Sequence, residues 1–372
     1  MKILFLSSYA HLVLDKASTK TSGGAELQVA LLARELASLG HEIVVAGGDI
    51  GQTDKMVFDG VTTRNAGKFH TGRLPEMLGA IPRVLSVLRE ERPDWVVVMG
   101  WTAWLFVLWA VRPFLGFQLD FVCALDSEVN GVYRKENPIF GTLFEFAMRR
   151  CDARHAITAD QKACMEASGM SCVFYRSLVF QRTGPLDGHK PVDFLWVSRC
   201  QPIKRPKLFI ELANALPDAS FEMVCSPENR PLWEEVRSLA AGCPNLVFFD
   251  NVPYHHIQDH FDRAKVFVNT SEWEGLPNTF IHSGLGRTAI LSLAVNPDGL
   301  FERHAPGVFA AGNFPSLIEA AQKMLAAPEW LSSLQGGSVR FVETTYNNAR
   351  ETGTFLSGLE QKYPPTGRSS AR

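Results

Sequence analysis

The sequence predicts an α/β protein made of two Rossmann-like domains, and three observations support this. The chain has 372 residues, the length of two domains of ordinary size. Short apolar runs alternate along it with longer segments of helical apolar spacing, as in doubly wound parallel sheets. A turn-rich segment without periodicity, 184–191, separates two such series and predicts a linker. We therefore expect one domain over 1–185 and a second over 186–345.

The first half begins as a strand, a loop, a helix and a strand. The apolar run 3–6 is typical of a strand buried on both faces. A polar loop that ends in glycines follows, and apolar residues then recur at helical spacing from Ala25 to Gly40, a good helix stop. The run 43–46 predicts the next strand. Further helices are expected at 81–90, 103–111, 143–150 and 160–167, and further strands at 95–99, 121–125 and 156–158.

The second half repeats this alternation. Strands are expected at 194–197, 221–224, 247–249, 266–269 and 290–293, and helices at 208–216, 233–240, 257–263, 278–285 and 315–325. Residues 338–360 have mostly helical character, and the tail 364–372 is expected to fray. In two such halves, ligands bind beyond the carboxyl ends of the strands, so the sequence predicts a site in a cleft between the domains.

Composition excludes several classes of protein. The formal net charge of −2 argues against bulk nucleic-acid binding, which needs a strong basic excess. The seven cysteines are scattered without a C-x-x-C pair, so neither a disulfide framework nor a zinc site is predicted. The apolar start of the chain is too short for a signal peptide, and 95–111 is too short to span a membrane. We expect a soluble, cytoplasmic protein.

Residues 271–280 are the most informative segment. They follow a predicted strand and open a predicted helix, with Pro277 near its first position, where proline is favoured. A helix N-terminus offers free backbone N–H groups and a positive dipole end, which suit a phosphate. Glu274 can accept hydrogen bonds from sugar hydroxyls. A helix-capping acid in a surface loop is the alternative interpretation.

A second loop adds positive charge at the same edge of the predicted sheet. Arg199 and Lys204 follow the strand 194–197. Arginine can grip a phosphate with two hydrogen bonds, and lysine acts as a point charge. An ordinary solvated basic loop is the alternative for this pair alone. Beside an acidic sugar-type site in the same half, a phosphate site is favoured.

Five segments, in order, resemble the family-four glycosyltransferases, which are retaining enzymes with the two-domain GT-B fold. They are S-G-G-A-E at 22–26, G-H-E at 40–42, V-S-R with a lysine at 197–204, E-G-L-P-N at 274–278 and N-P-D-G at 296–299. The resemblance covers most of the chain. It implies transfer of a hexose-type sugar, with retention, from a UDP- or GDP-sugar to a glycan, lipid-linked or small-molecule acceptor. It also implies a helix within 346–372 that packs back toward the N-terminal domain.

The resemblance assigns roles to particular residues. Arg199 and Lys204 would neutralise the leaving diphosphate, beside Ser198 in the same loop, and Glu274 would hold hydroxyls of the donor sugar. Gly23 and Gly24 would let the N-terminal loop approach the diphosphate without a Cβ in the way. The phosphates would meet the backbone of the helix start, at Gly275, Leu276, Pro277 and Asn278. No cofactor or metal is expected, because the nucleotide-sugar is a substrate.

The chain departs from the family pattern at two positions. The family has a second glutamate eight positions after the first, where it holds the nucleotide ribose; here that position is His282. Altered nucleotide binding is the functional hypothesis, and the alternative is a histidine on a helix face with no functional role. After the strand 121–125 the family often has a histidine that faces the donor sugar. Here Asp126 is the nearest candidate, either to orient acceptor or donor or as a solvated loop acid.

Weaker signals favour structural interpretations. The G-x-G-x-x-A letters at 284–289 end a predicted helix, the reverse of the dinucleotide-binding context. A polar helix face explains His255, His256 and His260 better than a metal site does. Arg149, Arg150 and Arg154 are expected to lie on a solvated face, and Trp101, Trp104 and Trp109 in the core. Contact of either group with anionic lipid or an acceptor is the alternative left open. Peripheral contact with the inner membrane face stays open.

Two other functions are kept beside the transferase. A GT-B-fold sugar-nucleotide-binding protein with impaired catalysis is suggested by His282 and by the loose match at Asp126. An epimerase of the same fold would also use a nucleotide-sugar. Release of UDP or GDP separates the first from a transferase, and product analysis without an acceptor separates the second.

Overall fold

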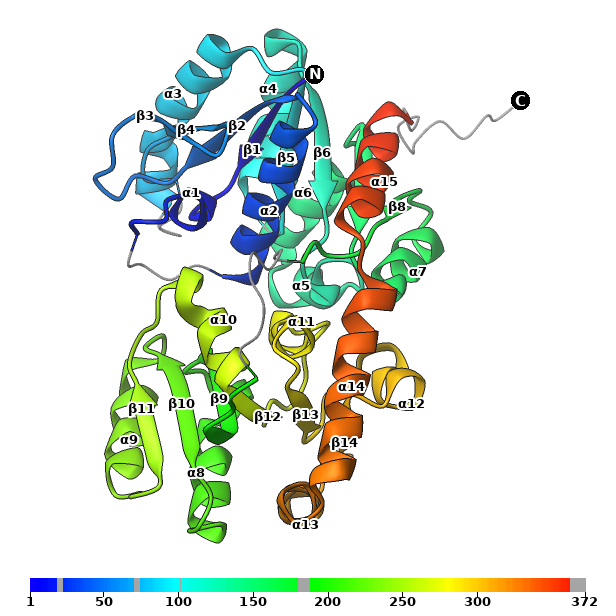
Figure 1. Cartoon of the computed structure of the whole chain (residues 1–372). Helices are drawn as coiled ribbons and strands as arrows, with labels where there is room; N and C mark the ends of the chain where they lie inside the picture. Colours follow the sequence, from blue (N-terminus) through cyan, green and yellow to red (C-terminus); the bar gives the residue numbers. More distant parts are fainter. Residues whose placement is uncertain (19–22, 70–73, 101, 180–187, 362–372) are drawn as a thin grey trace. The chain divides into compact units, whose positions relative to one another are not determined.

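The computed structural model describes residues 1–18, 23–69, 74–100, 102–179 and 188–361. They divide into two units, each with its own sheet (Figure 1). Unit 1 contains the described residues up to 179 and those from Tyr346 onward, and unit 2 contains 188–345. The expected linker lies outside the described residues at 184–187, as do Ser22, Trp101 and the tail 364–372.

Unit 1 is built on an eight-stranded sheet in the order β3-β4-β2-β1-β5-β6-β7-β8. All neighbours are parallel except β3 and β4. The strands are β1 (Lys2–Leu6), β2 (Glu42–Gly47), β3 (Lys55–Phe58), β4 (Val61–Asn65), β5 (Trp95–Met99), β6 (Gln118–Val122), β7 (Ala153–Ala156) and β8 (Val173–Phe174). Central strands such as β1 and β5 are buried almost throughout, which explains their unbroken apolar sequences.

The helices of unit 1 pack on this sheet. They are α1 (Ala10–Leu14), α2 (Gly24–Ser38), α3 (Leu74–Glu91), α4 (Trp104–Leu115), α5 (Val132–Glu136), α6 (Pro138–Met148), α7 (Ala159–Ala167) and α15 (Asn348–Glu360), with a short 3-10 turn η1 (Asp126–Glu128). The expected polar loop after the first strand therefore contains a helix, α1, whose residues are all buried. The predicted helix at 143–150 begins earlier, at Pro138, where proline suits the first turn.

The strand expected at 156–158 and the solvated face expected for Arg154 were wrong, each for a physical reason, and the hairpin β3–β4 was not expected. The strand expected at 156–158 is β7, at Ala153–Ala156, because its buried residues include Arg154 and His155. Arg154 donates to the carbonyls of Cys151 and Ser171, so it does not belong to a solvated basic face. The hairpin β3–β4 has little apolar character, yet its turn is Asp59-Gly60 with positive φ at both residues, a common hairpin signal.

The C-terminal helix α15 belongs to unit 1 and packs against β7, β8 and α2 (Figure 1). His155 Nδ1 lies 3.0 Å from both carboxylate oxygens of Asp120, and its Nε2 lies 3.2 Å from the carbonyl oxygen of Phe355 on α15. A Cβ added at Gly358 would come within 2.2 Å of His155 Nε2. Glycine at this position therefore permits the close approach of the helix to the sheet.

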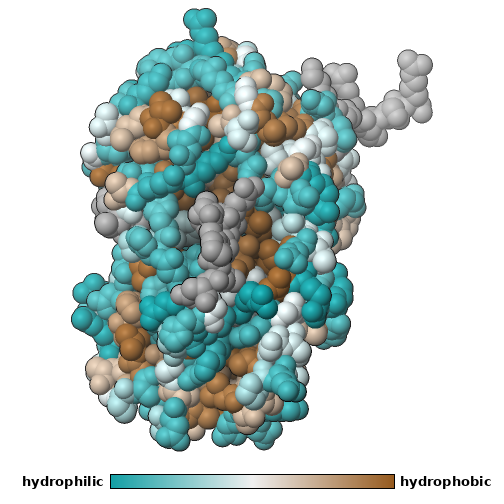
Figure 2. All heavy atoms as spheres, viewed as in Figure 1, coloured by the Kyte–Doolittle hydropathy of each residue, from teal (hydrophilic) through white to brown (hydrophobic). Residues whose placement is uncertain are grey.

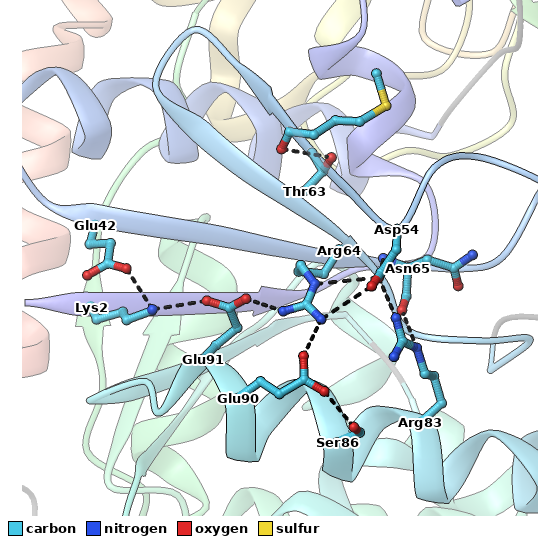
Figure 3. Close-up of polar contacts among 11 residues, drawn as sticks. Lys2, Glu42, Asp54, Thr63, Arg64, Asn65, Arg83, Ser86, Glu90 and Glu91 are labelled. Carbon is cyan, nitrogen blue, oxygen red and sulfur yellow. Dashed lines mark hydrogen bonds and ion pairs between the residues drawn. The ribbon is translucent and has the colours of Figure 1, made fainter.

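An ionic network joins β4 to α3 in unit 1 (Figure 3). Arg64 lies between Glu91, Glu90 and Asp54; its Nη2 is 2.6 Å from Glu90 Oε2. Lys2 links Glu91 to Glu42, at 3.0 and 2.6 Å. Burial alone would raise the pKa of Glu91, but hydrogen bonds from Lys2 and Arg64 lower it below the ordinary value. The network keeps two nearly buried charges, Arg64 and Glu91, paired.

Unit 2 is built on a six-stranded, all-parallel sheet in the order β11-β10-β9-β12-β13-β14. The strands are β9 (Val192–Arg199), β10 (Phe221–Ser226), β11 (Leu246–Phe249), β12 (Ala264–Asn269), β13 (Ala289–Ser292) and β14 (Gly307–Phe309). The helices are α8 (Pro206–Ala215), α9 (Arg230–Ala241), α10 (Tyr254–Arg263), α11 (Asn278–Leu285), α12 (Leu300–His304), α13 (Phe314–Ala326) and α14 (Pro328–Thr345), with short turns η2 (Pro202–Lys204) and η3 (Pro297–Gly299).

The helical segment expected at 338–360 is two helices, α14 and α15, in different units. The break falls at Tyr346 and Asn347, and the Asn347 side chain caps α15 by accepting from the backbone N–H of Arg350. The short strand β14 and helix α12 were not expected, because three and five residues carry little periodic pattern.

Candidate functional site

The candidate site forms where two neighbouring strands of unit 2 end. Strands β9 and β12 are parallel neighbours, so their carboxyl ends reach the same edge of the sheet. The loop after β9 carries Lys204, and the loop after β12 carries Glu274. Two hydrogen bonds join the loops: Thr270 Oγ1 donates to the carbonyl of Lys204 at 2.6 Å, and Glu272 N–H donates to Ile203 at 2.9 Å. The two loops therefore form one continuous surface.

Glu274 and Lys204 make an ion pair at this surface. Lys204 Nζ lies 2.7 Å from Glu274 Oε2. The other carboxylate oxygen accepts hydrogen bonds from Asn269 Nδ2 at 2.9 Å and from Ser271 Oγ at 2.6 Å. The side chains of Lys204 and Glu274 are 16% and 19% exposed, so both can be reached from solvent. The structure thus brings together two of the predicted site residues and fixes the carboxylate.

Three residues to which the sequence analysis gave no role hold this arrangement. Asn269 and Ser271, both buried, position Glu274. Arg205 donates to the carbonyls of Thr270 and Ser271, at 3.0 and 3.1 Å, and so holds the backbone of the loop after β12. Its φ of 46° lies in the left-handed region that a non-glycine residue rarely adopts. In the sequence, the one hint of these roles is a polar residue, Asn269, at the end of an apolar run.

Arg199 lies apart from this pair in its contacts. It is the last residue of β9, is about half exposed, and its Nη1 lies 2.9 Å from Glu228 Oε2. Gln201 Nε2 donates to the other oxygen of Glu228 at 2.5 Å. Within the described part of the chain, no hydrogen bond or ion pair joins Arg199 to Lys204 or Glu274. Ser198, also predicted as a donor contact, precedes Arg199 on β9 and is partly exposed.

The predicted phosphate-binding segment opens α11. Pro277 is the N-cap residue and Asn278 the first residue of the helix, and the cap has no side-chain hydrogen bond. The preceding Gly275 is exposed and Leu276 partly so. The positive dipole end at the start of a helix suits an anionic group. The helix ends at Leu285 with Gly286 as its cap, so the G-x-G-x-x-A letters do not open a helix.

His282 lies inside the packing of unit 2, on α11. It is 7% exposed, its Nδ1 is 2.7 Å from Gln258 Oε1, and its ring stacks on Phe261 with centroids 5.3 Å apart. Tyr254 makes an edge contact with the same ring. Burial lowers the pKa of His282 to about 4, so the imidazole is neutral at pH 7. Neutral Nδ1–H then donates to Gln258.

The site residues predicted in unit 1 lie at the start of α2 and after β6. Gly23 is the N-cap of α2 and Gly24 its first residue; a Cβ at Gly23 would meet only the flexible end of Glu26. Asp126 begins η1, is exposed, and accepts a hydrogen bond from Gln161 Nε2 at 3.1 Å. Glu128 in the same loop is buried and accepts from the backbone of Ala124.

The other sequence signals have local partners. His260 pairs with buried Glu222, and His256 pairs with Asp259 at 3.3 Å. The described residues contain no group of three or more His, Cys, Asp or Glu side chains arranged as a metal site. Trp104 is buried in the core of unit 1, and Trp109 packs against that core. No helix in the described ranges is both long and apolar enough to cross a membrane.

Comparisons with known proteins agree with this architecture. Residues 23–172 match the family model of the glycosyl transferase 4-like domain. Sucrose-phosphate synthase from Thermosynechococcus elongatus has a TM-score of 0.77 at 16% identity, over 97% of this chain and 98% of that one. The lipopolysaccharide glycosyltransferase WaaG gives 0.68 at 13% identity, over 96% and 100%. A UDP-forming trehalose-phosphate synthase from Burkholderia xenovorans gives 0.66 at 13%, over 97% and 99%.

A comparison with curated protein sequences gave no match. The structural likeness covers nearly the whole chain at low identity, so it establishes the fold, and the family model covers the N-terminal part. Two Rossmann-like units of this kind are the two halves of the GT-B fold. The chain therefore has the GT-B fold, and its residues 23–172 match the glycosyl transferase 4-like domain.

Proposed function

We propose that the chain is a retaining glycosyltransferase. It moves a hexose-type sugar from a UDP- or GDP-sugar to a glycan, lipid-linked or small-molecule acceptor. The observation that carries this proposal is the pairing of Lys204 Nζ with Glu274 Oε2, 2.7 Å apart beyond the carboxyl ends of β9 and β12. One group suits a diphosphate and the other suits sugar hydroxyls. Both are partly exposed, so a donor can replace their mutual contact.

The proposed mechanism is mainly electrostatic. Lys204 stabilises the negative charge that develops on the leaving diphosphate as the bond to the sugar breaks. Arg199 exchanges Glu228 for a phosphate oxygen and adds a second positive charge. Amides at the start of α11 contribute the helix dipole. The leaving phosphate takes the acceptor proton, so a strong general base is not needed, and Asp126 orients acceptor or donor.

Glu274 is proposed to hold the donor sugar. Asn269 and Ser271 already fix one of its carboxylate oxygens, which leaves the other to accept from a sugar hydroxyl once Lys204 turns to the phosphate. A carboxylate that is already held in place loses little freedom when the sugar binds. His282 is kept as a predicted nucleotide contact, although its Nδ1 hydrogen bond to Gln258 and the stacked Phe261 ring occupy much of its surroundings.

The test begins with a donor screen. UDP- and GDP-sugars are ranked by thermal shift, because a ligand of the folded state raises its stability. Nucleotide release is then measured with the best donor, and the product's anomeric configuration is read by NMR. We expect release with retention. A donor that binds without release with any acceptor offered would contradict the transferase.

Two variants test the roles of Asp126 and His282. Asp126→Asn keeps the shape of the exposed loop residue, and a normal turnover rate would exclude Asp126 from catalysis. His282→Glu restores the carboxylate of the family pattern, and donor affinity is measured by calorimetry. Unchanged affinity would make His282 a helix residue only.

The second candidate is a sugar-nucleotide-binding protein with impaired catalysis. His282 favours it, because a neutral imidazole whose Nδ1 donates to Gln258 offers one acceptor where a carboxylate offers several. Binding of UDP without turnover, together with gain of turnover in His282→Glu, is the result that would support it.

A further inference from the structure

Unit 1 exposes a group of large apolar side chains within a short part of the chain. Val132 begins α5, and Ile139, Phe140 and Leu143 lie in the first half of α6. Their exposed fractions are 42%, 74%, 50% and 38%. The spacing of the three residues on α6 puts them on one side of that helix. Apolar side chains gathered in this way mark an interaction surface more often than isolated ones do.

The two helices are held together as one hairpin. A Cβ added at Gly141 would lie 2.6 Å from the Cα of Arg134, so the backbones of α5 and α6 touch there. Phe144, one turn after Phe140, is buried in the core, where its ring meets Phe121 edge-on. We call Val132, Ile139, Phe140 and Leu143 the hairpin face. On the side of the protein drawn in Figure 2, hydrophilic side chains cover most of the surface, and hydrophobic ones gather in separate patches.

The hairpin is also basic. Residues 131–150 contain four cations and two carboxylates: Arg134, Lys135, Arg149, Arg150, Glu136 and Glu145. Arg134 and Arg149 share Glu145, at 3.0 and 2.8 Å, so one carboxylate serves two guanidinium groups. Arg134 is 58% exposed, and Lys135 beside it is exposed as well. Exposed apolar side chains next to surplus positive charge complement an anionic surface with an apolar interior.

We propose that the hairpin face docks on an anionic lipid bilayer. Ile139, Phe140 and Leu143 enter the region between headgroups and acyl chains, as an interfacial helix does, and Arg134 and Lys135 meet the anionic headgroups. Helix α5 packs against η1, which carries Asp126, so docking brings the bilayer beside this loop. Resting on the proposed function, this favours the lipid-linked acceptor among the three acceptor classes.

Flotation with vesicles tests the docking directly. The whole protein is mixed with vesicles of phosphatidylcholine alone or with equal phosphatidylglycerol, at low and high salt. We expect binding to the anionic vesicles, little to the neutral ones, and weaker binding at high salt, because salt screens the headgroup attraction. Equal binding to both vesicle types, or none to either, would overturn the proposal.

Variants locate the contact. Ile139→Ser with Phe140→Ser removes apolar insertion and should weaken vesicle binding at least about tenfold. Arg134→Glu with Lys135→Glu should weaken it by a similar factor or more, since each cation near an anionic surface contributes about fivefold. Phe114→Ser is the matched control, because Phe114 is 86% exposed and lies near the end of α4. Arg112, on the same turn of α4, pairs with Asp152, which follows the C-terminal end of α6, whereas the hairpin face lies near its N-terminal end.

The control variant should bind vesicles like the unchanged protein, and an equal loss there would refute the hairpin face. Sedimentation velocity tests whether a second copy of the chain occupies the face instead. An oligomer that becomes monomeric in the Ile139 and Phe140 variant, in a protein that does not bind vesicles, would assign the face to a second copy. Vesicle binding needs no turnover. A protein that releases nucleotide but does not float contradicts only this inference, and one that floats without turnover contradicts only the proposed function.

Discussion

Each unit contains a cluster of cations and carboxylates beside its sheet, and the two clusters differ in place and exposure. The network around Arg64 reaches the amino ends of β1 and β2 through Lys2 and Glu42 (Figure 3). The pair of Lys204 and Glu274 lies beyond the carboxyl ends of its strands. Arg64 and Glu91 are 5% and 7% exposed, against 16% and 19% for the pair in unit 2.

This difference separates stability from ligand binding. Arg64 and Glu91 are nearly buried and paired with each other, so removing Arg64 takes from Glu91 a partner that solvent cannot replace. Partly exposed charges at the carboxyl ends can exchange their partner for a ligand, in the place where open α/β sheets bind one. The same chemistry therefore predicts opposite results when a cation is removed from each cluster.

The largest expected effect is on stability in unit 1. Arg64→Met should lower the free energy of unfolding by about 3–5 kcal/mol, because Glu91 stays buried with only Lys2 to balance it. Urea denaturation followed by circular dichroism measures this. Arg83→Met is the control in the same network: Arg83 is 36% exposed and should cost less than about 1 kcal/mol. Similar losses in both variants would mean that burial does not set the cost.

The next effect is on activity in unit 2. Lys204→Met should lower the rate of sugar transfer about 10²- to 10³-fold, as loss of one charge-stabilising group does. Its unfolding free energy should change far less than that of Arg64→Met. Lys207→Met is the matched control, because Lys207 pairs with exposed Glu235. Activity is measured by nucleotide release, and normal activity in Lys204→Met would contradict the role of Lys204 on which the proposed function rests.

The sequence predicted the parts of the fold that depend on burial on both faces. The strand expected at 95–99 is β5, residue for residue, because such strands need an unbroken apolar run. The prediction for strand β7 was shifted along the chain, because Arg154 and His155 look polar in the sequence. They are buried because Asp120, the Phe355 carbonyl and other backbone carbonyls satisfy their hydrogen bonds. Partners that lie tens or hundreds of residues away leave no local pattern.

The site shows the same division. Strand ends and a helix start were enough to place Lys204 and Glu274 at one edge of a sheet, and the structure pairs them. Asn269, Ser271 and Arg205 could not be predicted, because their roles depend on backbone hydrogen bonds and on the φ of one residue. The burial of His282 depends likewise on Gln258 and Phe261 from another helix, α10.

A third prediction concerns pH. The unfolded chain takes up a proton at His282 near pH 6.5, whereas the buried imidazole does so only near the folded pKa of about 4. The unfolded state therefore binds more protons below pH 6.5, and stability falls as pH falls. Between pH 7.5 and 5 the loss should reach about 2 kcal/mol.

His282→Gln isolates this contribution, because the amide can still hydrogen-bond to Gln258 but does not titrate. The difference in unfolding free energy between the variant and the unchanged protein should shift with pH by the stated amount. His41 and His304, whose pKa values burial also lowers, are present in both proteins and cancel. A difference that is constant from pH 7.5 to 5 would show that His282 is not buried as described.

The smallest effect distinguishes Arg199 from Lys204 within the site. Arg199 is half exposed and engaged with Glu228, so it must break that contact before it meets a phosphate. Arg199→Met should raise the donor KM about fivefold, in line with the modest energies of exposed ion pairs. Glu228→Gln should act in the opposite direction, because it releases the guanidinium while Gln201 keeps a partner. If both variants raise KM alike, the Arg199–Glu228 pair itself shapes the site, and exchange of partners is confined to Lys204.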